Sequence, residues 1–267
     1  MTKNMPTPEQ EERAAEALLP HLLVTEILAR YRQGKGNEIA SNKFASPESS
    51  AALAANTFGL FLTRPSDLPQ LPCWTGDWQP ASVVPEVEVR FPWSGGLHPW
   101  LDVVVETDDH FIGIESKRYE PFRGRHDDGK APFSDAYWRD KWGRRMQPYE
   151  WLRDGLAKRP LLFKYLDAVQ LVKHAFGLRT QAHKRGKVPI LAYVYAEPES
   201  WPDGKPVSSD KRDQHAEEVR CFARLVDGAE VRFMHFTYRA LLATFSASTS
   251  RDVRHHADKV RERFDVI

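Results

Sequence analysis

Residues 100–117 read WLDVVVETDDHFIGIESK, and their pattern predicts two β-strands joined by a tight turn. Residues 100–106 and 111–117 are rich in valine and isoleucine, which favour strands, and the four polar residues between them are typical of a turn. A further strand is predicted over residues 84–93, where apolar and charged residues alternate. Three consecutive strands with short connections predict an antiparallel meander.

The register of this hairpin brings three charged side chains together. With Asp108 and Asp109 as the two turn residues, Asp102 lies directly opposite Glu115, with Cβ atoms about 4.5–5.5 Å apart. Side chains alternate between the two faces of a strand, so Lys117 shares the face of Glu115. The sequence therefore predicts two carboxylates and a lysine at one place on the sheet.

Such a group has a specific chemical use. Two neighbouring carboxylates disfavour each other's ionisation, and a divalent hard cation such as Mg²⁺ relieves this repulsion. The cation can activate water and polarise a phosphoryl oxygen. A lysine beside it can orient or deprotonate the water and stabilise negative charge on the phosphate. Gly113, on the same face, is expected to leave room for a bulky substrate. The simpler alternative is an exposed strand carrying a weak surface ion pair.

The rest of the chain predicts an α/β fold with a central mixed sheet flanked by helices. Expected helices cover residues 9–33 with a break at Pro20, 46–59 beginning at Ser46-Pro47-Glu48, 135–151, a segment including 162–176, and 210–226. Two more strands are expected at 188–195 and 230–236.

Composition excludes several classes of protein. The 267 residues carry 38 Lys and Arg against 37 Asp and Glu, so the chain is not a uniformly basic nucleic-acid coat. The two cysteines lack the spacing of a metal site and cannot build a disulfide framework, which favours a reducing compartment. We find no signal peptide and no apolar run of membrane-spanning length, so we expect a cytoplasmic protein that does not enter a membrane.

Leu101-Asp102 followed by Glu115-Ser116-Lys117, on a meander flanked by helices, resembles the PD-(D/E)xK restriction-endonuclease-like superfamily. The segments SSAALAANTFG (49–59) and IESKRYEPF (114–122) extend the likeness. Leucine stands where the motif has proline. The resemblance implies an αβββαβ core and divides the chain into an N-terminal helical segment (1–45), a nuclease-like domain (46–245) and a C-terminal helical tail (246–267).

The resemblance also implies roles for individual residues. Asp102 and Glu115 would bind Mg²⁺ or Mn²⁺, with the Ser116 carbonyl as a third ligand, and Lys117 would be the catalytic lysine. Many members add an acid from the first core helix, for which Glu48 is our first choice and Glu88 our second. Gln170, followed by His174, corresponds to a glutamine that several members carry after the motif, although histidine replaces the tyrosine of the exonuclease branch.

Basic residues cluster after the motif. Residues 158–187 hold eight Lys or Arg and one acid, and residues 117–145 hold nine against five, interleaved with Tyr137, Trp138 and Trp142. Clustered cations suit a phosphate backbone, and aromatic rings can stack on bases. We therefore expect a DNA endonuclease with a role in restriction, defence or repair. RNA is a second possible substrate, a homodimer is possible, and the alternative is a catalytically silent module for nucleic-acid binding or assembly.

Overall fold

The computed structural model describes residues 5–34, 37–93, 97–126, 129–139 and 142–265. Its longer helices and its strands are, in chain order, α1 (Pro8–Glu16), α2 (Val24–Gln33), α3 (Ser50–Phe58), β1 (Ser82–Glu88), β2 (Trp100–Glu106), β3 (His110–Lys117), α4 (Glu120–Arg123), α5 (Gln147–Lys158), α6 (Ala168–Arg185), β4 (Val188–Tyr195), α7 (Ser209–Leu225), β5 (Arg232–Thr237), α8 (Tyr238–Ser246) and α9 (Arg251–Phe264).

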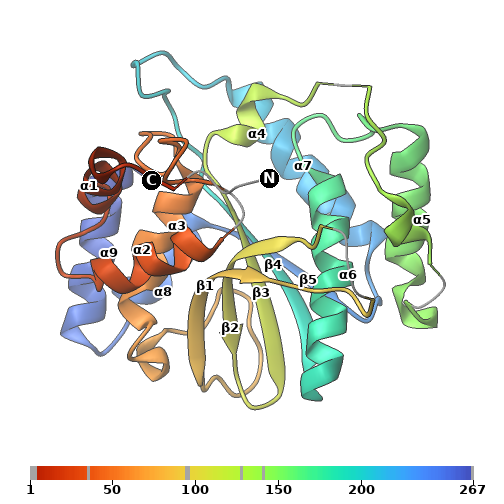
Figure 1. The fold of residues 1–267 in the computed structure, drawn as a ribbon, viewed down its shortest axis with the longest axis horizontal. Helices are drawn as coiled ribbons and strands as arrows, with labels where there is room; N and C mark the ends of the chain where they lie inside the picture. Colours follow the sequence, from red (N-terminus) through yellow and green to blue (C-terminus); the bar gives the residue numbers. More distant parts are fainter. Residues whose placement is uncertain (1–4, 35–36, 94–96, 127–128, 140–141, 266–267) are drawn as a thin grey trace.

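The described strands form one five-stranded mixed sheet in the order β1-β2-β3-β4-β5. The first three strands are antiparallel neighbours, whereas β4 runs parallel to both β3 and β5. Helices α1, α2, α3, α8 and α9 lie on one side of this sheet, and α5, α6 and α7 lie on the other (Figure 1). The predicted α/β class, the meander and the flanked mixed sheet are confirmed.

The two faces of the sheet bury two separate hydrophobic clusters because alternate side chains of each strand point to opposite sides. On β3, Ile112 and Ile114 join the cluster that contains α3, α8 and α9, while Phe111 joins the cluster around α6. The same alternation turns Glu115 toward α6 and Ser116 toward α3 and α8. Strand β3 thus supplies groups to both sides of the sheet.

Gly113 does not leave space for a substrate, contrary to our expectation. A Cβ atom at this position would lie 2.4 Å from Leu101 Cδ1 and 2.9 Å from Leu178 Cδ1. The missing side chain instead allows Leu101 and a leucine of α6 to pack directly on the strand. Gly113 is therefore a packing residue.

Several helices begin or end at other residues than predicted. The expected helix over 9–33 is two helices, because α1 ends at Glu16, before Pro20, and α2 begins at Val24. Helix α3 begins at Ser50 rather than after Ser46, because the side chain of Ser49 accepts the backbone N–H of Ala52 at 3.0 Å and caps the helix.

The predicted helix over 135–151 was also misplaced. A 3₁₀ turn covers Asp135–Trp138, and α5 begins only at Gln147. Helix α6 begins after residue 167, because the Asp167 side chain accepts the backbone N–H of Gln170 at 3.0 Å. In contrast, the β4 bounds agree with the sequence prediction.

The terminal segments pack into the same core as the central part of the chain. Leu18 and Ile27, Leu53 and Phe58, and Val260 all belong to the hydrophobic cluster on the α3 side of the sheet. The boundaries expected near residues 45 and 245 therefore do not separate cores.

Buried Arg118 adds a polar link between distant segments. Its guanidinium donates to the carbonyls of Pro47 and Phe264. The end of β3, the loop before α3 and helix α9 are thereby held together.

Candidate active site

The β2–β3 hairpin has the register that the sequence predicts. Val103 pairs with Ile114 and Glu106 pairs with Phe111, which makes Asp102 and Glu115 the next opposed residues along the ladder. The residue pairs between β2 and β3 end at Val103 and Ile114, and beyond them the backbone N–H of Ser116 donates to the side chain of Asp102, at Oδ2, over 2.7 Å. This hydrogen bond fixes the Asp102 carboxylate against the end of β3.

Glu115 is the most deeply buried acid of the group. Its side chain is 2% exposed, and Oε1 lies 2.6 Å from Lys117 Nζ. The second oxygen, Oε2, lies 3.2 Å from His174 Nδ1 on α6. Burial lowers the pKa of His174 to about 3, so this imidazole is neutral at neutral pH. Lys117 is therefore the cation that balances Glu115.

Burial and charge act on all three ionisable groups. Burial first, and then the charge of Glu115, raise the pKa of Asp102 well above its usual value. Burial likewise raises the pKa of Glu115, although Lys117 opposes this shift. Burial alone would lower the pKa of Lys117, but Glu115, Glu120 and Asp102 outweigh it and raise the pKa well above its usual value. Lys117 is consequently a charged ammonium, suited to orient a ligand rather than to accept a proton.

These groups lie in one cavity of about 650 Å³. Asp102, Glu115, Lys117, Gln170 and Glu48, all expected at the site, line it. Gln170 reaches it from the first turn of α6, one helical turn before His174. The structure thus brings together residues from the hairpin, from α6 and from the loop before α3.

Ser116 has a different place. Its hydroxyl is buried on the opposite face of the sheet, where it shares a 2.7 Å hydrogen bond with Tyr238 and donates to the Ser50 carbonyl at 3.2 Å. The role of the Ser116 carbonyl as a metal ligand stays a prediction.

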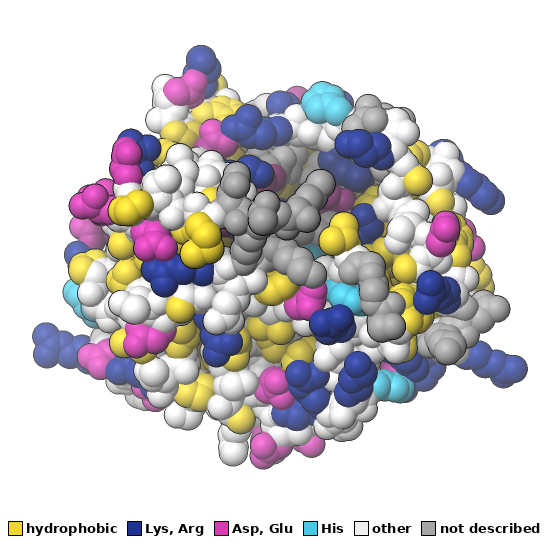
Figure 2. All heavy atoms as spheres, in the orientation of Figure 1, with side chains coloured by type: hydrophobic (Ala, Val, Ile, Leu, Met, Phe, Trp, Pro, Cys, Tyr) yellow, Lys and Arg dark blue, Asp and Glu magenta, His cyan; other side chains and the backbone are white. Residues whose placement is uncertain are grey.

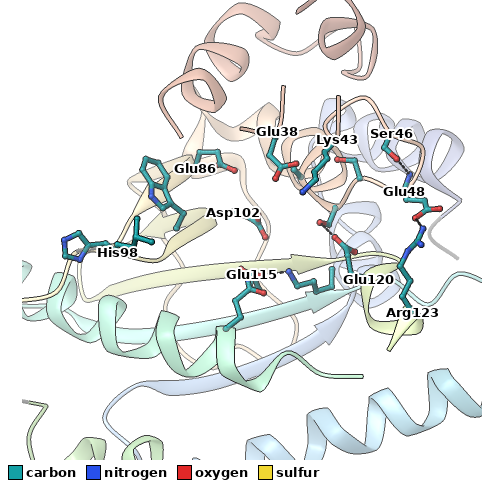
Figure 3. Close-up of a pocket in the computed structure, with 17 residues that line it drawn as sticks. Glu38, Lys43, Ser46, Glu48, Glu86, His98, Asp102, Glu115, Glu120 and Arg123 are labelled. Atoms are coloured by element: carbon teal, nitrogen blue, oxygen red, sulfur yellow. Dashed lines mark hydrogen bonds and ion pairs between the residues drawn. The ribbon is translucent and has the colours of Figure 1, made fainter. Parts of the chain in front are cut away.

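Glu48 does not stand on the first turn of a helix, as expected, because α3 begins two residues later. Its carboxylate forms an ion pair with Arg123 of α4, and Figure 3 shows it turned toward that arginine. The second choice, Glu88, lies 3.5 Å from Arg90 in an ion pair and is not among the residues that line the cavity.

The sequence reasoning missed Glu86, which also lines the cavity. Pro85 pairs with Val103 and Val87 with Leu101, so Glu86 lies opposite Asp102 across β1 and β2. Figure 3 shows Asp102 between the side chains of Glu86 and Glu115. Glu86 has a φ of 52°, in the left-handed region that non-glycine residues rarely adopt. The alternation of apolar and charged residues in the sequence gives no sign of this backbone conformation.

Two other carboxylates surround the same cavity. Glu120 accepts hydrogen bonds from Ser50 Oγ at 2.5 Å and from the Arg118 backbone N–H at 3.0 Å. Glu38 comes from the segment between α2 and α3, and burial raises its pKa. Nothing in the sequence indicates that the short helix at 120–123 or the loop around residue 38 lies beside the hairpin.

The donor chemistry fits a hard divalent cation. Asp102 and Glu115 offer carboxylate oxygens, and Mg²⁺ characteristically takes one or two carboxylates and keeps several waters. Within the described ranges, no group of three or more His, Cys, Asp and Glu side chains is arranged to hold a metal. Asp102 and Glu115 would supply such an ion with two carboxylates, and water would have to complete its coordination.

The basic segments do not form one continuous field. Lys187 and Arg185 lie 3.0 and 3.5 Å from Glu106, which is four residues, or about 13 Å, along β2 from Asp102. Arg179 pairs with Glu230 at 3.3 Å. Positive and negative side chains are mixed over the face that Figure 2 shows. Three of the eight basic residues in 158–187 therefore pair with acids that are distant in the sequence.

Two of the three aromatic residues expected to stack on bases are core residues. Tyr137 and Trp142 are buried, and Trp142 stacks on Phe176 with ring centroids 4.3 Å apart. Trp138 is 44% exposed, but the Arg153 guanidinium lies 4.3 Å from the centre of its ring. Lys141, counted in the basic segment, lies outside the described residues.

Comparison with protein-family models, with curated proteins and with solved structures found no significant match to this chain. In the part of the chain that the structure describes, no helix combines the length and the apolar character needed to cross a bilayer.

Proposed function

We propose that this protein is a metal-dependent endonuclease that hydrolyses phosphodiester bonds in DNA. The observation that carries the proposal is the hairpin register, which sets Asp102 against Glu115 with Lys117 2.6 Å from the latter, at one cavity. The order of α3, the β1–β3 meander, α6 and β4 supports a restriction-endonuclease-like αβββαβ core. Both the chemistry and the element order are those that the family resemblance implies.

Each residue has a role that follows from its position. Asp102 and Glu115 would hold Mg²⁺ or Mn²⁺, which when bound supplies Lewis-acid polarisation of the phosphoryl oxygen and of water. The Lys117 ammonium would orient the attacking water and stabilise the charge that develops on the phosphate. Gln170, which also lines the cavity, can donate its amide N–H groups to the substrate. His174, whose Nδ1 lies 3.2 Å from Glu115 Oε2, would limit the positions that the Glu115 carboxylate can take.

The test is cleavage of supercoiled plasmid DNA with Mg²⁺, with Mn²⁺ and with EDTA. We expect metal-dependent nicking or linearisation, which is lost in Asp102→Asn, Glu115→Gln and Lys117→Ala. Asp108→Asn, an exposed acid in the turn of the same hairpin, is the matched control and should cut like the parent. Equal cutting by Asp102→Asn and the parent would show that the site is wrongly assigned.

One observation favours a second candidate, a nucleic-acid-binding module without catalysis. The ammonium of Lys117 already balances Glu115, so the buried acid has a cation of its own. Salt-sensitive DNA binding with no cleavage under any metal condition would select this candidate. Cleavage of RNA but not of plasmid DNA, in the same assay, would instead assign an RNA substrate.

A further inference from the structure

A second cavity, of about 500 Å³, lies next to the first and shares Gln170 with it. Its polar lining consists of Arg125, His126, Lys130, Asp167, Gln170 and Lys173, and we call it the Arg125 cavity. Helix α6 borders both cavities: Gln170 and Lys173 line the Arg125 cavity, while His174 contacts Glu115. The two cavities therefore lie next to each other along α6.

Arg125 is fixed in place before any ligand binds. Its backbone N–H donates to the Lys164 carbonyl at 2.8 Å, and its guanidinium donates to the Pro160 carbonyl at 3.1 Å. The same guanidinium lies 3.5 Å from Asp167 Oδ1. The side chain nevertheless stays 24% exposed, so donors remain within reach of a ligand. A preorganised, partly exposed arginine suits an oxyanion.

Among the described residues that line it, the Arg125 cavity has more basic than acidic side chains. Asp167 is the one carboxylate of these described residues; it lies 3.5 Å from the Arg125 guanidinium, acts on Lys173, and caps α6 by accepting the Gln170 N–H at 3.0 Å. Burial lowers the pKa of Lys173, and the charge of Arg125 lowers it further, against the opposing effect of Asp167. An anion would offset this crowding of cations. Arg179 and Arg185 in the second half of α6 and Lys187 just after it, in contrast, already have acidic partners in Glu230 and Glu106.

We propose that the Arg125 cavity binds a phosphate of the nucleic-acid strand, next to the phosphodiester bond that is cleaved at Asp102 and Glu115. This inference rests on the proposed nuclease function and assigns the path of the substrate, which passes Gln170 from the acidic cavity to the basic one. The phosphate can belong to the interior of a strand or to its end, because both present negatively charged phosphoryl oxygens to Arg125 and Lys173.

The experiment measures binding without cleavage, in EDTA, by fluorescence anisotropy of labelled DNA over a range of salt concentrations. Each lost phosphate contact should make the slope of log K against log salt shallower, by about 0.9 on duplex DNA and about 0.7 on single strands. If variant and parent bind equally at about 1 M salt, the duplex value corresponds to roughly eightfold weaker binding by the variant at about 0.1 M salt. We expect this change in Arg125→Ala and in Lys173→Gln. Lys259→Gln, on α9 and outside the basic segments, with a side chain 42% exposed, is the matched control and should keep the parental slope.

Three DNA forms identify the source of the phosphate. Loss of affinity on a circular single strand assigns an interior phosphate, whereas a loss confined to 5′- or 3′-phosphorylated linear strands assigns a terminal one. Parental slopes in both variants would overturn the inference, and thermal melts monitored by circular dichroism show whether a variant has folded. Because Lys173→Gln removes no backbone hydrogen bond, it remains informative if Arg125→Ala fails to fold.

The outcome is separable from that of the proposed function. If the parent binds DNA through Arg125 and Lys173 but never cleaves it, the nuclease proposal fails and the phosphate cavity stands. If the parent cleaves and the two variants bind like the parent, the cavity assignment fails and the nuclease stands.

Discussion

Replacing Lys117 by methionine should destabilise the protein strongly, because it removes the cation from a buried carboxylate. Glu115 is 2% exposed, and its other neighbour, His174, is neutral. Breaking a buried ion pair by removing one partner costs about 3–5 kcal/mol. With an unfolding entropy of about 2.1 cal/mol/K per residue, a chain of 267 residues should lose about 5–9 °C in Tm.

The assay is a reversible thermal melt in EDTA at neutral pH, followed by circular dichroism. Lys117→Met/Glu115→Gln should recover most of the loss, because the double variant leaves no unbalanced buried carboxylate at position 115. Lys184→Met, which removes an exposed lysine, should change stability by less than about 0.5 kcal/mol. A Tm for Lys117→Met within about 1 °C of the parent would refute the reasoning, since a 3 kcal/mol loss cannot produce so small a shift.

Three further predictions concern packing, pH and metal. Gly113→Ala should cost about 1–3 kcal/mol through the two close leucine contacts, whereas Gly155→Ala, whose Cβ would meet nothing within 4 Å, should stabilise α5 by about 0.5–1 kcal/mol in urea unfolding. His256 Nε2 donates to the Thr57 carbonyl at 3.1 Å and Nδ1 accepts from His21, and burial lowers the pKa of His256 to about 4. The unfolded state therefore binds the extra proton between about pH 6.5 and 4, and His256 contributes up to about 1.4 kcal/mol per pH unit to the loss of stability as the pH falls. This contribution should be missing in His256→Asn and present in His255→Asn, while the contribution of other buried histidines such as His174 remains in both. Mg²⁺ at ten times its dissociation constant should stabilise the parent by about 1.4 kcal/mol, and an equal shift in Asp102→Asn would contradict the assigned ligand.

The hairpin was predictable because the residues that determine its pairing lie close together in the sequence. Two valine- and isoleucine-rich segments and a two-residue turn specify both the pairing and the face of every side chain, so the positions of Asp102 and Glu115 followed directly. Gln170 was expected at the site from the family resemblance, and it lines the same cavity. The periodicity of the two strands therefore accounts for the positions of Asp102, Glu115 and Lys117, but not for that of Gln170.

The remaining residues depend on contacts between segments far apart in the chain. Ser46 and Ser49 both precede residues suited to a helix start, and only the folded backbone shows that Ser49 is the cap. Glu86 reaches the cavity because the pairing of β1 with β2 sets it opposite Asp102, and no register for these two strands was predicted from the sequence. Local charge counting also failed for Lys187, whose partner Glu106 lies on another strand.

The continuity of the 102–117 segment has a consequence for folding kinetics. The acids and the lysine come from one hairpin with a two-residue turn, and such hairpins form within about 1–10 μs, before contacts of larger sequence separation. Carboxylates in this hairpin can therefore meet divalent ions while the chain is still largely unfolded. Any such early binding subtracts from the stabilisation that the ion gives to the native state, so refolding rates measured with and without Mg²⁺ would report on the site independently of equilibrium melts.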